Sequence, residues 1–173
     1  MEQKQQITYN GSIDILIVTK EESLLPRRWS QSAMCIDLCA SEDIKFFPGQ
    51  TKIPTWVKLA MPSHIWAKIY ARSSTYEKFW VTLANWVWII DSDYRGELFV
   101  SILATAEWEI KKWEKIAQLS FEPNYITLIE NKIINRQACQ FKVVVDEKLF
   151  NELDTQLKTE RGDWSFWSTD KTE

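Results

Sequence analysis

The stretch NWVWIIDSDYRGE, residues 85 to 97, places an acidic turn between two apolar segments. Asp91 and Asp93 lie in the turn, and the apolar segment 98–104 follows it. Because Asp and Gly are residues that tight turns prefer, the stretch predicts a turn between two β-strands. Taken alone, it is either an ordinary solvated turn or a site with catalytic carboxylates.

Short segments rich in Ile and Val occur along most of the chain, and several of them alternate apolar with polar residues. They are residues 13–18, 52–61, 65–70, 98–104, 115–121 and 141–145. Turn-forming residues separate them at roughly the spacing that is typical of β-sandwiches and barrels. The pattern therefore predicts an all-β domain.

Two segments predict helices instead. STYEKF (74–79) is long enough for one short helix, and in 146–158 leucines recur at every fourth position, which predicts a helix that packs on the sheet. The last residues, 161–173, show no periodicity. We therefore expect one domain over 1–160 and a C-terminal tail over 161–173.

Composition narrows the functional classes. The 21 basic and 24 acidic residues give a net charge of −3, which provides no broad electrostatic footprint for nucleic acid. The three cysteines form no CxxC pair and indicate neither a disulfide framework nor a zinc site. The N-terminus is polar and no apolar run could span a bilayer, so we expect a soluble, cytoplasmic protein. His64 follows Pro62 and is expected in a solvated turn without a role.

Four further segments accompany the opening stretch in a fixed order: SAMCIDLCA (32–40), ARSS (71–74), KIAQL (115–119) and RGDWSFWSTD (161–170). Together the five resemble the motifs of the trimeric dUTP diphosphatase (dUTPase) family. Ala71 departs from the usual proline, and the segment 120–160 is longer than usual. The resemblance implies a jelly-roll-like distorted β-barrel, a homotrimer and Mg²⁺-assisted hydrolysis of dUTP to dUMP and pyrophosphate. Each site would combine residues of three subunits.

The resemblance also implies a role for each matching residue. Asp91 would activate the attacking water, and Asp37 would approach the metal indirectly, through water. The phosphate contacts would be Arg72, Ser73, Gln118, Arg161, Ser168 and Thr169, with Gln118 alternatively contacting a metal-bound water. Ser74 would also be a substrate-binding residue. Asn85 and Phe166 would contact uracil, and Tyr94 would lie under the deoxyribose.

The chemistry of the residues agrees with these roles. Splitting a nucleoside triphosphate needs a positioned water, a carboxylate that takes its proton and cations on the phosphate oxygens. The forked donors of Arg72 and Arg161 suit phosphate, and Mg²⁺ held mainly by the triphosphate needs no dedicated protein cage. Two alternatives stay open: a dCTP deaminase, which shares the fold, and a non-catalytic nucleotide-binding or regulatory homologue.

Tryptophan and glycine occur in unusual numbers. The chain has ten Trp and four Gly, whereas average usage predicts about 12 Gly in a chain of this length. The family pattern has or accepts Gly at Trp56, Trp80, Trp86, Trp88, Trp113, Trp164 and Trp167. The positions of Trp29, Trp66 and Trp108 do not distinguish glycine from tryptophan. Trp80 follows the predicted short helix, where left-handed backbone is common.

One hypothesis explains both numbers. The codon UGA, translated here as Trp, would be read as Gly in the source organism, so that bare backbone could approach the nucleotide at these positions. The alternative is that the tryptophans are literal and fill the core of a decayed, non-catalytic paralogue.

Overall fold

The computed structural model describes residues 12–124, 138–143 and 148. Almost all of its elements are β-strands, which confirms the all-β class. In chain order they are β1 (Ser12–Thr19), the 3-10 turn η1 (Glu22–Leu24), β2 (Ile36–Cys39), β3 (Ile44–Phe46), β4 (Gly49–Ala60), β5 (Ile65–Tyr70), α1 (Thr75–Phe79), β6 (Val81–Leu83), β7 (Val87–Ile90), β8 (Glu97–Ala104), β9 (Trp108–Ile110), β10 (Lys115–Pro123) and β11 (Ala138–Val143).

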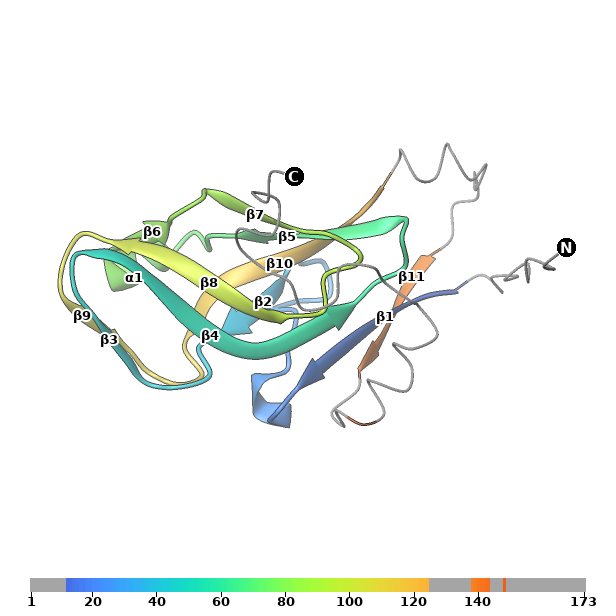
Figure 1. The fold of residues 1–173 in the computed structure, drawn as a ribbon, viewed down its shortest axis with the longest axis horizontal. Coiled ribbons are helices and arrows are strands. Elements are labelled where there is room, and N and C mark those ends of the chain that lie inside the picture. The colour runs from blue at the N-terminus through green and yellow to red at the C-terminus, as the bar shows by residue number, and fades with distance from the viewer. Residues whose placement is uncertain (1–11, 125–137, 144–147, 149–173) are drawn as a thin grey trace, which may run out of the picture.

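The strands form three sheets. Their orders are β11-β1-β4-β8-β6, β2-β10-β5-β7 and β3-β9. The pair β1–β11 is parallel, and the other pairs are antiparallel. The β3–β9 ribbon lies at one end of the molecule, and β1 with β11 lies towards the other (Figure 1). Among the described strands no hydrogen-bonded ladder joins the two large sheets, so the expected barrel is not closed.

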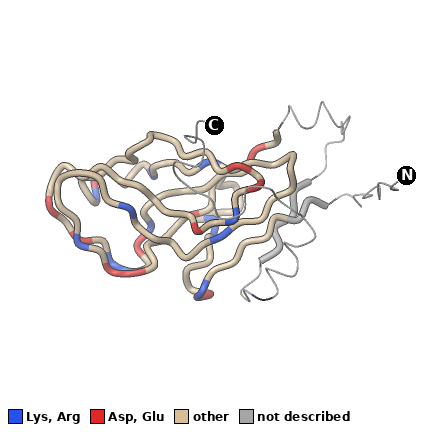
Figure 2. Tube along the Cα trace, in the orientation of Figure 1, with Lys and Arg blue, Asp and Glu red and all other residues tan. Residues whose placement is uncertain are grey.

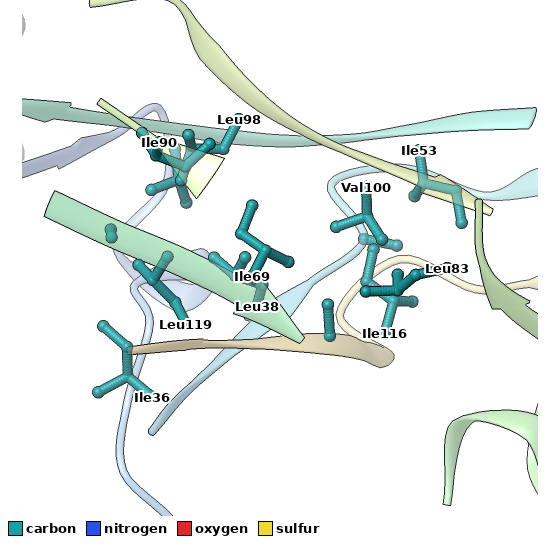
Figure 3. Packing of buried hydrophobic residues seen from close by; sticks show 14 of the residues in the cluster. Ile36, Leu38, Ile53, Ile69, Leu83, Ile90, Leu98, Val100, Ile116 and Leu119 are labelled. Carbon is teal, nitrogen blue, oxygen red and sulfur yellow. The ribbon is translucent and has the colours of Figure 1, made fainter. Parts of the chain in front are cut away.

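One cluster of buried side chains connects the two large sheets. Ile53 of β4 and Val100 of β8 come from the five-stranded sheet, while Ile69 of β5 and Leu119 of β10 come from the four-stranded sheet. These side chains point into the same interior (Figure 3). Alternate residues of β4 and β5 are buried, as a strand with one face on the core requires.

The longer predicted elements are confirmed. Five predicted strands match observed ones: 13–18 matches β1, 52–61 matches β4, 65–70 matches β5, 98–104 matches β8 and 115–121 matches β10. The predicted short helix, STYEKF, contains α1. The segment 141–145 overlaps β11, which begins earlier, at Ala138. The helix predicted over 146–158 lies outside the described residues, apart from Lys148.

The expectation for His64 was wrong. Its turn is closed by the hydrogen bond from the Ile65 N–H to the Pro62 carbonyl, at 2.9 Å, yet His64 is only 5% exposed. The Asn124 N–H donates to the His64 carbonyl at 2.6 Å, so the end of β10 packs beside this turn. Burial lowers the pKa of the His64 imidazole below its ordinary value.

The described helices are also informative about membranes. Within the described ranges, no helix has the length and apolar character that crossing a bilayer would take.

Candidate active site

A single row of paired residues crosses the four-stranded sheet. Asp37 of β2 pairs with Gln118 of β10, Gln118 pairs with Tyr70 of β5, and Tyr70 pairs with Val87 of β7. Directly paired residues point to the same face of a sheet. The register therefore brings residues from four of the five motifs, which are far apart in sequence, to one end of this sheet.

Asp37 lies at the centre of an ion cluster at this end. Its Oδ1 lies 2.9 Å from the Nε of Arg72, and its Oδ2 lies 2.8 Å from the Nζ of Lys115. The Asp37 side chain is only 11% exposed, whereas the side chains of Arg72 and Lys115 are 25% and 37% exposed, so the carboxylate is buried and both cations reach solvent. Two cations on one carboxylate leave an excess positive charge, which suits an anionic ligand.

Lys115 is not among the site residues predicted from the sequence. It is the first residue of the KIAQL motif, in which Gln118 is the predicted site residue. Its ammonium also lies 4.9 Å from the ring centroid of Trp29, within the range of a cation–π contact. The signal that could have identified it was its place in that motif.

Hydrogen bonds fix the loop that carries the second motif. The Arg72 N–H donates to the Oγ1 of Thr75 at 3.0 Å, and that hydroxyl donates to the Ile116 carbonyl at 3.3 Å. The Arg72 guanidinium donates to the Lys115 carbonyl at 3.1 Å. The Gln118 side-chain amide donates to the Ala71 carbonyl at 2.8 Å, so Gln118 positions this loop in the structure.

The two serines of the motif follow Arg72 directly. Ser73 is exposed and Ser74 is partly exposed, at the residue that precedes α1. The Ser74 hydroxyl makes no capping hydrogen bond to this helix. Both side chains are therefore near the ion cluster in sequence and are accessible to solvent.

The acidic turn is more than a solvated loop, because its middle is buried. The guanidinium of Arg95 is buried and donates to the carbonyls of Ser92 and Tyr94, at 2.7 and 3.0 Å. The Tyr94 N–H donates to the Asp91 carbonyl at 3.1 Å, and the Tyr94 hydroxyl donates to the Glu97 carbonyl at 2.9 Å. The turn is thus held from inside and presents Asp91 at the surface.

Asp91 and the ion cluster lie at opposite ends of the sheet. Asp91 follows Ile90, which pairs with Ala67, whereas Arg72 follows Tyr70 at the other end of β5. A strand rises roughly 3.3 Å per residue, so the three steps from Ala67 to Tyr70 span about 10 Å of β5. The exposed Asn85 precedes β7 at the Arg72 end. One chain therefore brings Asp37, Arg72 and Gln118 together but not Asp91.

The remaining predicted residues, Arg161, Phe166, Ser168 and Thr169, lie outside the described part of the chain.

The described residues offer limited ligands for a metal. They contain no group of three or more His, Cys, Asp or Glu side chains that could hold an ion. Asp37 is a hard oxygen ligand next to two cations, which suits a metal held mainly by ligand phosphates.

Acidic and basic residues are interspersed along the described part of the chain (Figure 2).

Comparison with known proteins identifies one family. Residues 21–145 match the family model of dUTPase. The deoxyuridine 5'-triphosphate nucleotidohydrolase of Desulfitobacterium hafniense is 36% identical over 121 residues, which cover 66% of this chain and 80% of the relative. The enzyme of the same name from Nautilia profundicola is 31% identical over 154 residues, covering 87% of this chain and 94% of the relative.

Solved structures agree in fold. The crystal structure of dUTPase from Streptococcus mutans has a TM-score of 0.58 and 28% identity, covering 61% of this chain and 89% of that one. The structure of a mutant dUTPase from phage phi11 of S. aureus, described as revealing the coordination of a structural Mg(II) ion, has a TM-score of 0.56 at 18% identity, over 63% of this chain and 90% of that one.

Proposed function

Since the chain belongs to the dUTPase family, we propose that it hydrolyses dUTP to dUMP and pyrophosphate with a water molecule that Asp91 activates. The observation that carries this proposal is the ion cluster at Asp37. Its excess positive charge lies beside the two accessible serines of the second motif. This arrangement supports the binding of a triphosphate, whose oxygens carry the charge that a catalytic site must stabilise.

The proposed reaction is a displacement at the α-phosphorus. Water attacks this atom, its proton passes to the Asp91 carboxylate, and the bond to the oxygen that bridges the α- and β-phosphates breaks. Pyrophosphate then leaves and dUMP remains. The exposure of Asp91 and the buried framework of its turn support this role, because the residue is accessible and the turn that carries it is held from inside.

The phosphates would be held by residues of the ion cluster. Arg72 and Lys115 provide the cations, Ser73 and Ser74 the hydroxyls, and Gln118 holds the loop through the Ala71 carbonyl. A Mg²⁺ ion bound with the triphosphate, approached by Asp37 through water, would withdraw charge from the phosphate oxygens. The nucleoside would lie along β7, with uracil at Asn85 and the deoxyribose near Tyr94.

We further propose that the active form is a homotrimer, located in the cytoplasm. The separation of Asp91 from Arg72 within one chain supports a site shared between subunits. The domain of residues 1–160 would provide the base and phosphate contacts. The tail, 161–173, would close over the site of a neighbouring subunit, with Arg161, Ser168 and Thr169 on the phosphates and Phe166 over uracil.

The test of this proposal is the Asp91→Asn variant. We expect its turnover of dUTP to fall by about 10²–10⁴-fold, because a general base contributes on that order. The variant should still fold and keep the parent's assembly mass, since Asp91 is exposed. Asp43→Asn is the matched control, because Asp43 is an exposed carboxylate that pairs with Lys111. Activity of Asp91→Asn within twofold of the parent would remove Asp91 from this role.

Two further assays separate the alternatives. Release of ammonia from dCTP would indicate a deaminase. Binding of dUTP without any release of pyrophosphate would indicate a non-catalytic homologue. We expect pyrophosphate release from dUTP and no ammonia from dCTP.

A further inference from the structure

Every non-glycine residue with a positive φ angle in the described ranges is a tryptophan. These are Trp56 (φ 56°), Trp80 (55°), Trp86 (59°) and Trp113 (68°). Left-handed backbone brings the β-carbon of an L-residue too close to its own carbonyl, and glycine alone adopts it freely. For a side chain as bulky as Trp such a conformation is a true outlier.

Two of these positions occur in local structures that normally use glycine. Trp80 ends α1 with φ 55° and ψ 34°, and its N–H donates to the Tyr76 carbonyl at 2.8 Å. Helices commonly end in a left-handed glycine. Trp113 is the third residue of a turn closed by the hydrogen bond from the Glu114 N–H to the Lys111 carbonyl, at 3.0 Å. A positive φ at this third residue is typical of a type II turn, in which glycine is the usual residue there.

The other two positions follow the same rule. Trp56 lies where the pairing of β4 with β8 is irregular, between Pro54 and Lys58. Left-handed residues in β-bulges are typically glycine. Trp86 ends the turn that begins at Leu83, and its N–H donates to the Leu83 carbonyl at 3.3 Å. Glycine is the favoured fourth residue of such turns.

The indole rings of three of these residues are largely exposed. Trp80, Trp86 and Trp113 are 48%, 87% and 55% exposed, so they do not fill the core as a literal reading would require. The Nζ of Lys112 lies 5.0 Å from the ring centroids of both Trp56 and Trp113. A cation–π contact at an exposed site stabilises by less than left-handed backbone costs.

Backbone conformation therefore divides the described tryptophans into two groups. The other members, Trp29, Trp66, Trp88 and Trp108, have no positive φ. Three of them, all except Trp88, are also the three at which the family pattern does not call for glycine. Trp88 packs against the core from β7. The division by φ comes from the structure and is independent of the composition.

We propose that positions 56, 80, 86 and 113 are glycine in the polypeptide that the source cell makes, because UGA codons at these positions are decoded there as glycine. The proposal rests on backbone angles and not on the proposed function. It would explain the shortage of glycine and the excess of tryptophan in one step.

The first experiment reads the gene and the native protein. We expect UGA at all four positions and UGG at Trp66 and Trp108. Trypsin cleaves after Lys78 and Arg95, so fragmentation of the peptide 79–95 from the source cell should show glycine at positions 80 and 86. A UGG codon or an indole at any of the four positions would overturn the proposal for that position.

The second experiment measures what the fold prefers. The starting protein carries all four Trp→Gly changes. Four variants of it each restore tryptophan at one of these positions. Each return should lower the midpoint of thermal unfolding by about 2–4 °C or more. The matched control is Trp108→Gly, because Trp108 is 46% exposed, like Trp80, but lies in β9 with ordinary backbone. This control should lower the midpoint of thermal unfolding, whereas glycine in place of tryptophan at position 80 should raise it. Equal destabilisation by glycine at positions 80 and 108 would overturn the proposal for position 80.

Discussion

The ring of Tyr94 lies directly against the backbone of Gly96. A β-carbon at Gly96 would lie 2.6 Å from the Cζ and 2.8 Å from the Cε2 of that ring, well inside normal contact. The ring cannot withdraw easily, because Tyr94 is buried and its hydroxyl is bonded to the Glu97 carbonyl. Glycine at position 96 is therefore required by the packing of the acidic turn.

The variant Gly96→Ala should consequently displace Tyr94. Overpacking of this kind costs about 1–3 kcal/mol, so we expect a lower free energy of unfolding and a higher KM for dUTP. Urea unfolding and steady-state kinetics measure the two effects. Ser92→Ala, in the same turn, removes a hydroxyl without adding contacts and is the control. Unchanged stability of Gly96→Ala would show that the turn adapts.

The variant Lys115→Met should weaken phosphate binding. Charge-assisted hydrogen bonds contribute about 1.5–3 kcal/mol, which corresponds to a rise of about 10–100-fold in the KM for dUTP. The effect should shrink at high salt. Lys111→Met is the control, because Lys111 pairs with Asp43 and Glu109 at the surface and lies outside the ion cluster. Equal KM values for the two variants would exclude Lys115 from the site.

The variant Thr75→Val should disturb Arg72 without touching its side chain. It removes the acceptor of the Arg72 N–H and the donor to the Ile116 carbonyl while keeping the shape of a buried side chain. We expect a loss of about 1–3 kcal/mol in unfolding free energy, together with a higher KM. Thr82→Val, at an exposed position of β6, should change neither. A variant with the parent's stability and KM would argue against this anchoring.

His64 should make stability depend on pH. Burial lowers the pKa of the folded imidazole below its ordinary value of 6.5, so the unfolded chain binds the proton more readily. The stability that neutral His64 provides is therefore complete above pH 6.5 and is lost as the pH falls from there through the folded pKa. Urea unfolding at successive pH values, compared with His64→Gln, isolates this contribution. NMR can follow the imidazole directly, because the chain has a single histidine. Parallel pH curves for both proteins would contradict the prediction.

The long strands could be predicted from the sequence because their alternation is visible. The segment 52–61 covers most of β4, which begins at Gly49 and ends at Ala60. The strands β2, β3, β6, β7 and β9 have three or four residues each, too few for a periodic pattern. His64 was misjudged because Pro and Ser before it indicate a turn, but not whether that turn faces the core.

The candidate site was predictable only in part for a related reason. The motifs identified Asp37, Arg72 and Gln118 one by one, but their proximity depends on pairing between distant strands, which no local pattern reports. Lys115 resembles any solvated lysine until its distance to Asp37 is known. The left-handed backbone expected at Trp80 is confirmed, because the end of a short helix is a local feature.

The strand register restricts where insertions and deletions can be accepted during evolution. It aligns four residues in one row across the sheet: Asp37, Gln118, Tyr70 and Val87. An insertion of one residue inside β10 or β5 would slide whole motifs past each other and turn their side chains to the opposite face. Connecting segments, by contrast, can lengthen or shorten without altering that alignment. Tolerance to insertions and deletions in this chain is therefore expected to stop abruptly at the ends of those strands.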